Sequence, residues 1–183
     1  LLYENRLNVL RLAYENFRDV ESLNMYDELC RQMSPEAALQ KINFGSRDNQ
    51  RRPFCWDGSE YAGFSTAEPW IPVHSEYQAC NLTADQKAEK SVWRFYRDLL
   101  HLRHNHPALT VGGFMPVASR DTNYCAFTRT QGNEQFLVVC NFETAQTLQI
   151  PNAYGKLVLS NYGIQEKTDN LYAPYEVAVF RRI

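Results

Sequence analysis

The sequence lacks most of the patterns that identify membrane, metal-binding and nucleotide-binding proteins. Its 183 residues contain no apolar run of about 18 residues, the minimum for a membrane-spanning helix. They contain no C-x-x-C pair, no G-x-G-x-x-G, no P-loop and no H-E-x-x-H motif. We therefore expect no membrane partner, no bound metal and no cofactor.

Cysteine is scarce, odd in number and widely spaced: Cys30, Cys55, Cys80, Cys125 and Cys140. This pattern is atypical of a disulfide framework and favours a reducing, cytoplasmic location. The net charge of −2 gives no electrostatic reason to expect a nucleic-acid partner. The chain shows no signal-peptide pattern and begins with Leu rather than Met, so we expect it to start inside a longer protein.

The most distinctive stretch is residues 46–73, SRDNQRRPFCWDGSEYAGFSTAEPWIPV. Its three prolines and two glycines exclude a long helix or strand, and we expect an irregular loop. Its aromatic side chains carry a large apolar surface that must pack against something. A loop of this length inside a compact chain is usually functional.

The same stretch carries a recognisable motif, in which the run from Arg47 to Arg51 is followed by Pro53, Trp56-Asp57, Ala62-Gly63-Phe64 and Pro69-Trp70. This resembles the RDNxRxPxxWD…AGF…PW signature of the oligo-1,6-glucosidase and α-glucosidase branch of the α-amylase superfamily, glycoside hydrolase family 13. Residues 17–24, FRDVESLN, resemble the same branch. The resemblance covers about residues 14–183.

The resemblance implies a fold, because members of this family carry a catalytic (β/α)8 barrel followed by an antiparallel β-domain. Residues 1–106 would be the C-terminal end of the barrel, with 46–73 as a substrate-side loop and about 84–105 as the last helix. Residues 107–183 would be the antiparallel β-domain. A complete barrel needs about 250 residues. We therefore expect an α+β fragment, the end of a barrel followed by an antiparallel β-sandwich.

Helical signals occur in the first part of the chain. Apolar spacing predicts a helix over about 20–32, and Ser34-Pro35 predicts the start of another that ends near Ile42. Thr83 and Gln86 form a capping-box pattern for a helix that ends at 105–107, with room for a break near Ser91. One predicted face of this amphipathic helix, which should pack against a larger body, contains Val92, Trp93, Tyr96, Leu99, Leu100 and Arg103.

Short β-type runs dominate the second part, at 124–130, 135–142, 147–150, 156–159 and 176–181. Polar turns separate them, and the spacing is typical of an antiparallel sandwich. Residues 130–133, TQGN, predict a hairpin turn. Aromatic residues in this part (Tyr124, Phe127, Phe136, Phe142, Tyr172 and Tyr175) are interpreted as core, with a carbohydrate-binding face as the alternative.

A retaining glycosidase needs two carboxyl groups, one as nucleophile and one as general acid and base. The sequence contexts that carry these groups in the family are not found here. Asp19 and Glu21 are close in sequence, but at a helix start we expect them to point to different sides. We assign no catalytic residue and predict that the isolated chain does not turn over glucosides.

By the resemblance, Arg47 would contact the sugar in the −1 subsite and Glu21 would contact the next sugar. The alternative for Arg47 is a structural ion pair with Asp48, Asp57 or Glu60. The alternative for Glu21 is an acidic residue favoured by the helix dipole. We interpret Asp48 and Arg51 as a structural pair that shapes the loop.

Other chemistry-bearing residues have structural interpretations. Trp56 and Trp70 are interpreted as buried anchors rather than sugar platforms, and Cys125 and Cys140 as core thiols. The histidines near the end of the long helix (His101, His104 and His106) are interpreted as cations at a helix C-terminus, with a metal site as the alternative.

These observations predict the C-terminal part of an α-glucosidase that would act on α-1,6 or α-1,4 bonds of short oligosaccharides. A trehalose-6-phosphate hydrolase or a relative of the sucrose isomerases is the alternative within the family. From another class, the chain could be a non-catalytic β-sandwich module for stability or interaction. Because a truncated barrel end would leave apolar surface uncovered, self-association is also expected.

Overall fold

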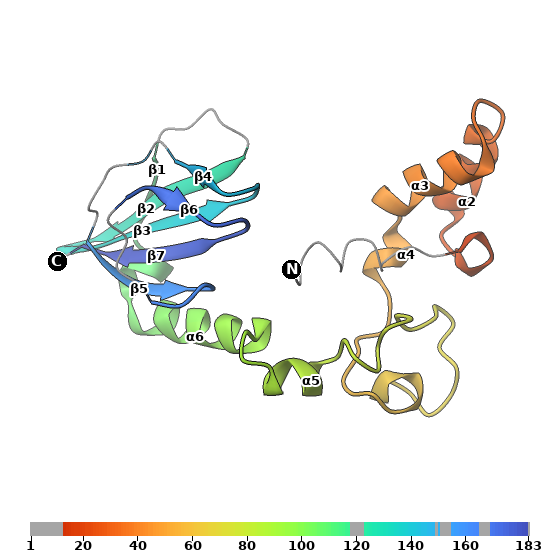
Figure 1. Cartoon of the computed structure of the whole chain (residues 1–183), viewed down its shortest axis with the longest axis horizontal. Helices are drawn as coiled ribbons and strands as arrows, with labels where there is room; N and C mark the ends of the chain where they lie inside the picture. The colour runs from red at the N-terminus through yellow and green to blue at the C-terminus, as the bar shows by residue number, and fades with distance from the viewer. Residues whose placement is uncertain (1–12, 118–122, 149, 151–154, 165–168, 183) are drawn as a thin grey trace. The chain divides into compact units, whose positions relative to one another are not determined.

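The computed structural model describes residues 13–117, 123–148, 150, 155–164 and 169–182. The chain forms two compact units that divide between Glu89 and Lys90 (Figure 1). No helix in the described ranges is long and apolar enough to cross a membrane. The first twelve positions, whose role the sequence left open, lie outside the described residues.

The first unit is helical at its start. A 3-10 turn, η1 (Tyr14–Asn16), precedes helices α2 (Val20–Leu29), α3 (Pro35–Gly45) and α4 (Arg47–Gln50). Buried Phe17 and Ile42 form a small core between them, and Leu23, Tyr26, Leu29 and Leu39 pack around it. The predicted start of α3 is confirmed, because the Ser34 hydroxyl accepts a hydrogen bond from the Ala37 N–H and Pro35 opens the helix. α2 ends before the predicted residue 32, and α3 continues past Ile42.

The 46–73 stretch is more structured than a plain irregular loop. It contains α4 and a 3-10 turn, η2 (Glu60–Gly63). Within η2 the backbone of Tyr61, Ala62 and Gly63 has positive φ, and the Ala62 carbonyl accepts from the N–H groups of Trp56 and Asp57. The Asp57 carboxylate also accepts hydrogen bonds from Ser59 and lies against Gly63, where a side chain would clash. The WD and AGF elements of the motif therefore fix the loop's own shape.

The predicted capping box at Thr83 is wrong. Asn81 caps helix α5 (Leu82–Lys87) by accepting from the Ala84 N–H, while the Thr83 hydroxyl donates to the Trp56 carbonyl. Asn is at least as good an N-cap as Thr, and it precedes the helix at the position where a cap is needed. The predicted break near Ser91 is confirmed, since Ser91 caps a separate helix, α6 (Val92–Asn105).

The second unit is built on an antiparallel sheet with strand order β1-β2-β3-β7-β5 (Figure 1). The strands are β1 (Gly113–Pro116), β2 (Tyr124–Gln131), β3 (Glu134–Asn141), β5 (Lys156–Ser160) and β7 (Val177–Arg181). The predicted hairpin turn is confirmed, because Gln131 pairs with Glu134 across Gly132-Asn133 and Gly132 has a φ of 57°. The short helix α7 (Pro107–Thr110), strand β1 and strand β6 were not predicted.

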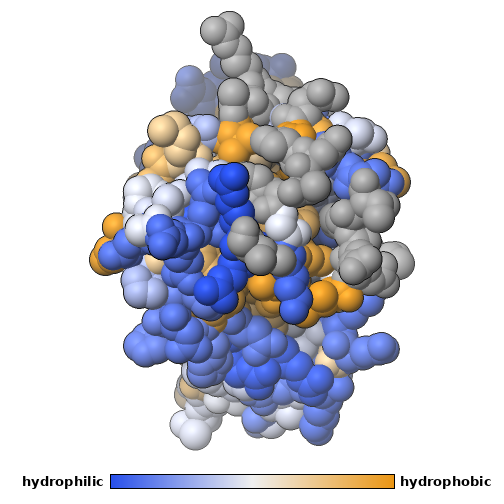
Figure 2. Space-filling model, turned by 90° about the vertical axis from the view of Figure 1, so that its left-hand side faces the viewer, coloured by the Kyte–Doolittle hydropathy of each residue, from blue (hydrophilic) through white to orange (hydrophobic). Residues whose placement is uncertain are grey.

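One face of the five-stranded sheet carries the main core. The core also contains Leu148, which follows β4 (Gln146–Thr147), and Tyr172 of β6 (Leu171–Tyr172), the two strands of a separate pair. The antiparallel prediction is confirmed, whereas the sandwich and barrel assignments stay predictions. Of the predicted core aromatics, Tyr124, Phe136 and Tyr172 are buried, Phe127 is half-buried, and Phe142 and Tyr175 are exposed. Figure 2 shows hydrophobic residues that remain at the surface near the middle of one face.

The other face of the sheet meets helices α6 and α7. Ala108 of α7 joins Phe136 and Val179 in a second core, with Leu102 of α6 packed against it. α6 therefore lies in the same compact unit as the sheet. The predicted domain boundary near residue 106, which refers to a complete enzyme, stays a prediction.

Candidate functional site

The candidate site in the first unit is centred on Arg47. Its Nη2 lies 2.5 Å from Asp19 Oδ1 and 3.2 Å from Glu21 Oε2. The side chain of Asp19 is nearly buried, whereas those of Arg47 and Glu21 are 49% and 70% exposed. The two residues singled out from separate motifs, Arg47 and Glu21, are therefore in direct contact at a solvent-accessible point.

Local sequence explains this arrangement. Asp19 is the N-cap of α2 and accepts hydrogen bonds from the Ser22 N–H and hydroxyl, which places Glu21 in the first helical turn. Ser46 caps α4 by accepting from the Asp48 N–H, and its Oγ lies 3.0 Å from Ser22 Oγ. Because the one hydroxyl proton of Ser22 goes to the Asp19 carboxylate, the Ser46 hydroxyl is the donor in this contact. The starts of α2 and α4 are thus joined, and Arg47 projects from one toward the acids of the other.

Asp48 of α4 connects the start of α4 to the start of α2 through its buried carboxylate. Its Oδ2 accepts hydrogen bonds from the backbone N–H groups of Arg18 at 2.6 Å and Asp19 at 2.7 Å. Asp48 is 1% exposed, so these bonds are shielded from water. Its carboxylate therefore fixes the backbone that carries the cap residue Asp19.

Charge pairing stabilises the ionised forms at this cluster. The hydrogen bond from Arg47 is the main reason that the pKa of Asp19 lies below its usual range, and the Ser22 bonds add to it while burial opposes it. The same contact raises the pKa of Arg47. A general acid needs a raised pKa, so Asp19 is not suited to protonate a leaving group.

Several sequence interpretations of this region are wrong. Asp19 and Glu21 do not point to different sides, because the cap position and the first turn both reach Arg47. The ion-pair partners of Arg47 are Asp19 and Glu21, not Asp48, Asp57 or Glu60. Asp48 binds backbone N–H groups instead of pairing with Arg51.

The tryptophans of the loop are also exposed in this chain, against the prediction of buried anchors. Trp56 is 50% exposed and Trp70 is 74% exposed, while Phe54 packs edge-on against Trp56. Ile71, beside Trp70, is buried. The loop is therefore anchored by small and aliphatic residues and presents its largest rings outward.

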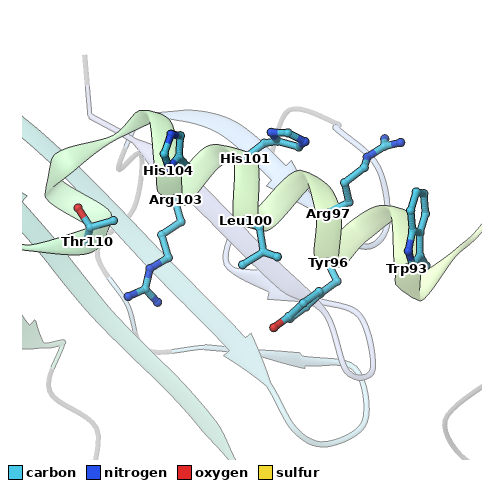
Figure 3. Close-up of a pocket in the computed structure, with 8 residues that line it drawn as sticks. All are labelled: Trp93, Tyr96, Arg97, Leu100, His101, Arg103, His104 and Thr110. Carbon is cyan, nitrogen blue, oxygen red and sulfur yellow. The ribbon is translucent and has the colours of Figure 1, made fainter. Parts of the chain in front are cut away.

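An open groove of about 660 Å³ lies on the second unit, and neither Arg47 nor Glu21 is among its lining residues. Figure 3 shows Tyr96, Leu100 and Arg103 pointing to one side of α6, and Arg97, His101 and His104 to the other. The remaining lining residues are Trp93 and Thr110.

The predicted exposure of the apolar face of α6 is found at Trp93, Tyr96 and Leu100, whereas Leu99 is only half-exposed. The apolar residues that the sequence placed on one face of the helix therefore lie on two sides of it, with Tyr96 and Leu100 on one side and Trp93 on the side of Arg97 (Figure 3).

Of the three histidines near the end of α6, His104 lies in its last turn and His106 is its C-cap residue. No group of three or more metal-ligating residues occurs within the described ranges. His106 Nδ1 lies 2.7 Å from Glu134 Oε1, and Glu134 also contacts the Ala108 N–H and Arg181. Burial raises the pKa of Glu134, but the His106 hydrogen bond and the other contacts outweigh it and leave the pKa below its ordinary value. Glu134 thereby ties the start of α7 to strands β3 and β7.

Sequence reasoning named Asp19 and Asp48 but missed their roles, Asp19 as the N-cap that pairs with Arg47 and Asp48 as the acceptor for two backbone N–H groups. A signal for Asp19 was present, since Asp directly before an apolar helical run is a preferred N-cap residue. No local signal identifies the partners of Asp48, which lie 29 and 30 residues away in the chain.

Comparison with known proteins gives consistent matches. The model of the α-amylase catalytic domain matches residues 16–112. The oligo-1,6-glucosidase of Parageobacillus thermoglucosidasius is 34% identical over 184 residues, which is 95% of this chain and 33% of that protein. The trehalose-6-phosphate hydrolase of Bacillus subtilis (strain 168) is 35% identical over 175 residues, 91% of this chain and 31% of that protein.

Solved structures agree with these matches. A trehalose-6-phosphate hydrolase of Bacillus licheniformis superposes with a TM-score of 0.79 at 31% identity, over 92% of this chain and 32% of that one. An isomaltulose synthase mutant of Erwinia rhapontici NX5, solved with sucrose, superposes with a TM-score of 0.78 at 30% identity, over 93% of this chain and 32% of that one. The chain thus spans about a third of the length of the relatives it matches.

Proposed function

The chain belongs to the α-amylase family, and we propose that it is the C-terminal part of a retaining α-glucosidase that hydrolyses terminal α-1,6 or α-1,4 bonds of short oligosaccharides. In this proposal the chain supplies one wall of the glucose pocket and the catalytic carboxylates belong to the preceding part of the complete enzyme. The isolated chain is then inactive. Support comes from the family match and from the oligo-1,6-glucosidase relative.

One observation carries the proposal: Arg47 and Glu21 meet at an exposed point. A guanidinium presents a rigid fork of donors that can bind two sugar hydroxyls while keeping its charge. Asp19 holds that fork from the buried side, so the donors that remain exposed are oriented before a sugar arrives. In the complete enzyme Arg47 would bind the terminal glucose, and Glu21 would accept from a hydroxyl of the next sugar.

The experiment uses a chimera, in which this chain replaces the matched third of the Parageobacillus thermoglucosidasius enzyme. Arg47→Lys keeps the charge that pairs with Asp19 but lacks the fork. We expect kcat/KM for isomaltose to fall by about 10- to 100-fold, the order of one lost transition-state contact. Arg31→Lys, an exposed position outside the cluster, is the matched control and should leave it unchanged.

A purely structural role for Arg47 makes a different prediction. Arg47→Lys would then lower the thermal midpoint of the chimera while kcat/KM per folded molecule stayed constant. Release of glucose from isomaltose by the isolated chain would separately contradict the assignment of the catalytic carboxylates elsewhere. Assays of the chimera with isomaltose, trehalose 6-phosphate and sucrose would compare the main proposal with the trehalose-6-phosphate hydrolase and sucrose-isomerase alternatives.

The second candidate is a non-catalytic module that associates with a copy of itself. The observation that favours it is the exposure of large apolar side chains on α6, where Trp93, Tyr96 and Leu100 are 38%, 61% and 49% exposed. Exposed apolar patches of this kind promote association. Light scattering at tens of micromolar should then show oligomers that Tyr96→Glu disrupts and that the control Ile164→Glu, at another exposed apolar residue, does not. A monomer at that concentration would rule this candidate out.

A further inference from the structure

Two cysteines face each other across the central hairpin of the second unit. Cys125 of β2 is the direct antiparallel partner of Cys140 of β3. Directly opposed residues point to the same face of a sheet, because side chains alternate along both strands in step. Tyr124 and Ala126, the neighbours of Cys125, belong to the main core, so the two thiols lie on the opposite face.

The register gives the separation that a disulfide needs. Across a two-residue turn the closing pair, Gln131 and Glu134, is hydrogen-bonded, and alternation along the ladder makes Cys125–Cys140 a pair of the same type. The Phe142 N–H bond to the Asn123 carbonyl, two positions further on, fits this alternation. Pairs of this type have Cα atoms about 5.5 Å apart, which is within the usual range for disulfides.

We propose that Cys125 and Cys140 form a reversible, oxidant-sensitive dithiol site that closes to a cross-strand disulfide when the protein meets a small-molecule disulfide such as oxidised glutathione. All five cysteines are free in the structure, so the reduced form is the starting state. This proposal does not depend on the glucosidase assignment.

The two thiols have different exposures, which sets the order of the steps. Cys125 is exposed and Cys140 is half-buried, and burial is the main cause that raises the pKa of Cys140 to about 11. The Cys125 thiolate attacks one sulfur of oxidised glutathione and displaces the first glutathione thiolate. Cys140 then loses its proton to water, attacks Cys125 Sγ in the mixed disulfide and displaces the second. Two protein thiols are oxidised while one disulfide is reduced to two thiols.

The cross-strand geometry also favours reversibility. Cβ atoms of opposed residues are typically about 4.5–5.5 Å apart, whereas a relaxed disulfide prefers about 3.5–4.5 Å. The Cβ atoms of Cys125 and Cys140 must therefore move slightly closer together when the bond forms. Strained and exposed disulfides are the ones that thiols reduce readily.

The test is peptide mapping of the purified chain after exposure to oxidised glutathione. Trypsin cleaves after Arg129, between the two cysteines, so a Cys125–Cys140 bond joins two separate peptides and is identified by mass under non-reducing conditions. We expect this linkage to exceed every linkage that involves Cys30, Cys55 or Cys80, and to disappear after treatment with reduced glutathione. The same reaction in urea is the control for geometry, and there the preference should be lost.

Two variants separate the steps. In Cys140→Ser, glutathione should remain attached to Cys125, and in Cys125→Ser, Cys140 should stay mostly reduced. In the unmodified chain, the rate at which the mixed disulfide resolves should rise about 10-fold for each unit by which the pH increases, as long as the pH stays below the pKa of Cys140. The proposal is overturned if both cysteines carry separate glutathiones without a linkage, or if folded and unfolded chains give the same distribution of linkages. It is also overturned if other cysteines oxidise while this pair stays reduced.

Discussion

Replacing Asp48 by alanine would leave two buried backbone N–H groups without an acceptor. Both groups, from Arg18 and Asp19, donate to the same oxygen, Asp48 Oδ2, at 2.6 and 2.7 Å. Each unsatisfied buried donor costs about 1–3 kcal/mol, so Asp48→Ala should destabilise this part of the first unit by about 2–6 kcal/mol. That range approaches the whole free energy of unfolding of a small domain.

A graded series sharpens the prediction. In Asp48→Asn the amide oxygen can take the place of Oδ2 and keep both hydrogen bonds, so only the contribution of the charge is lost. Neutral hydrogen bonds are weaker than charged ones by about 1 kcal/mol each, which gives an expected loss of about 1–3 kcal/mol. Asp27→Asn, at an exposed position on α2, is the control and should change stability by less than about 0.5 kcal/mol.

The measurement must report on the first unit alone, because the chain has two compact units and its unfolding need not be two-state. Pulse-labelling hydrogen exchange across a urea series, read by mass spectrometry on a peptide from residues 14–29, meets this need. The urea midpoint of that peptide should fall in the order Asp27→Asn, Asp48→Asn, Asp48→Ala, while a peptide from β3 serves as internal reference. If Asp48→Ala behaves like the control, the role assigned to this carboxylate is wrong.

Two further predictions concern charged groups. The pKa of Asp19 is lowered from 3.8 in the folded state, so the unfolded chain binds this proton more tightly. Its stabilising contribution should be complete above about pH 5, one unit above the unfolded pKa, and should be lost as the pH falls through the lowered folded pKa. The urea midpoint of the 14–29 peptide, measured from about pH 7 to about pH 3, should show this loss, and Asp19→Asn should reduce the slope. In the second unit, Glu134→Gln removes the charge that His106, the Ala108 N–H and Arg181 share, and should cost about 1–2 kcal/mol. Glu143→Gln, an exposed change beyond the other end of β3, is its control, and equal urea midpoints for the two variants in a β3 peptide would contradict the assigned contacts.

Local features of the fold were accessible from the sequence. Ser34-Pro35, the break at Ser91 and the turn at Gly132-Asn133 were predicted because each depends on a few adjacent residues with strong backbone preferences. Thr83 was misread because Asn81, two residues earlier, satisfies the same requirement. The short helix α7 and the two-residue strands lack the periodicity that longer elements show.

The candidate site was accessible only in part. The motif resemblance selected Arg47 and Glu21, which the structure brings together, but no local rule connects Arg47 with an acid 28 residues earlier. Trp56 and Trp70 were expected to be buried because large rings usually are. Their exposure depends on what covers them, which is a property of tertiary context and is not encoded in the loop itself.

The contact between Glu134 and the start of α7 has a consequence for the groove on α6. Glu134 bonds to His106 and the Ala108 N–H, directly after the end of α6, and Leu102 packs against the sheet. The helix is therefore clamped at its C-terminal end, and the side that carries Leu100 and Arg103 keeps one orientation relative to the strands. A surface that is already ordered loses little conformational entropy when another surface covers it, so more of the contact energy is available for affinity.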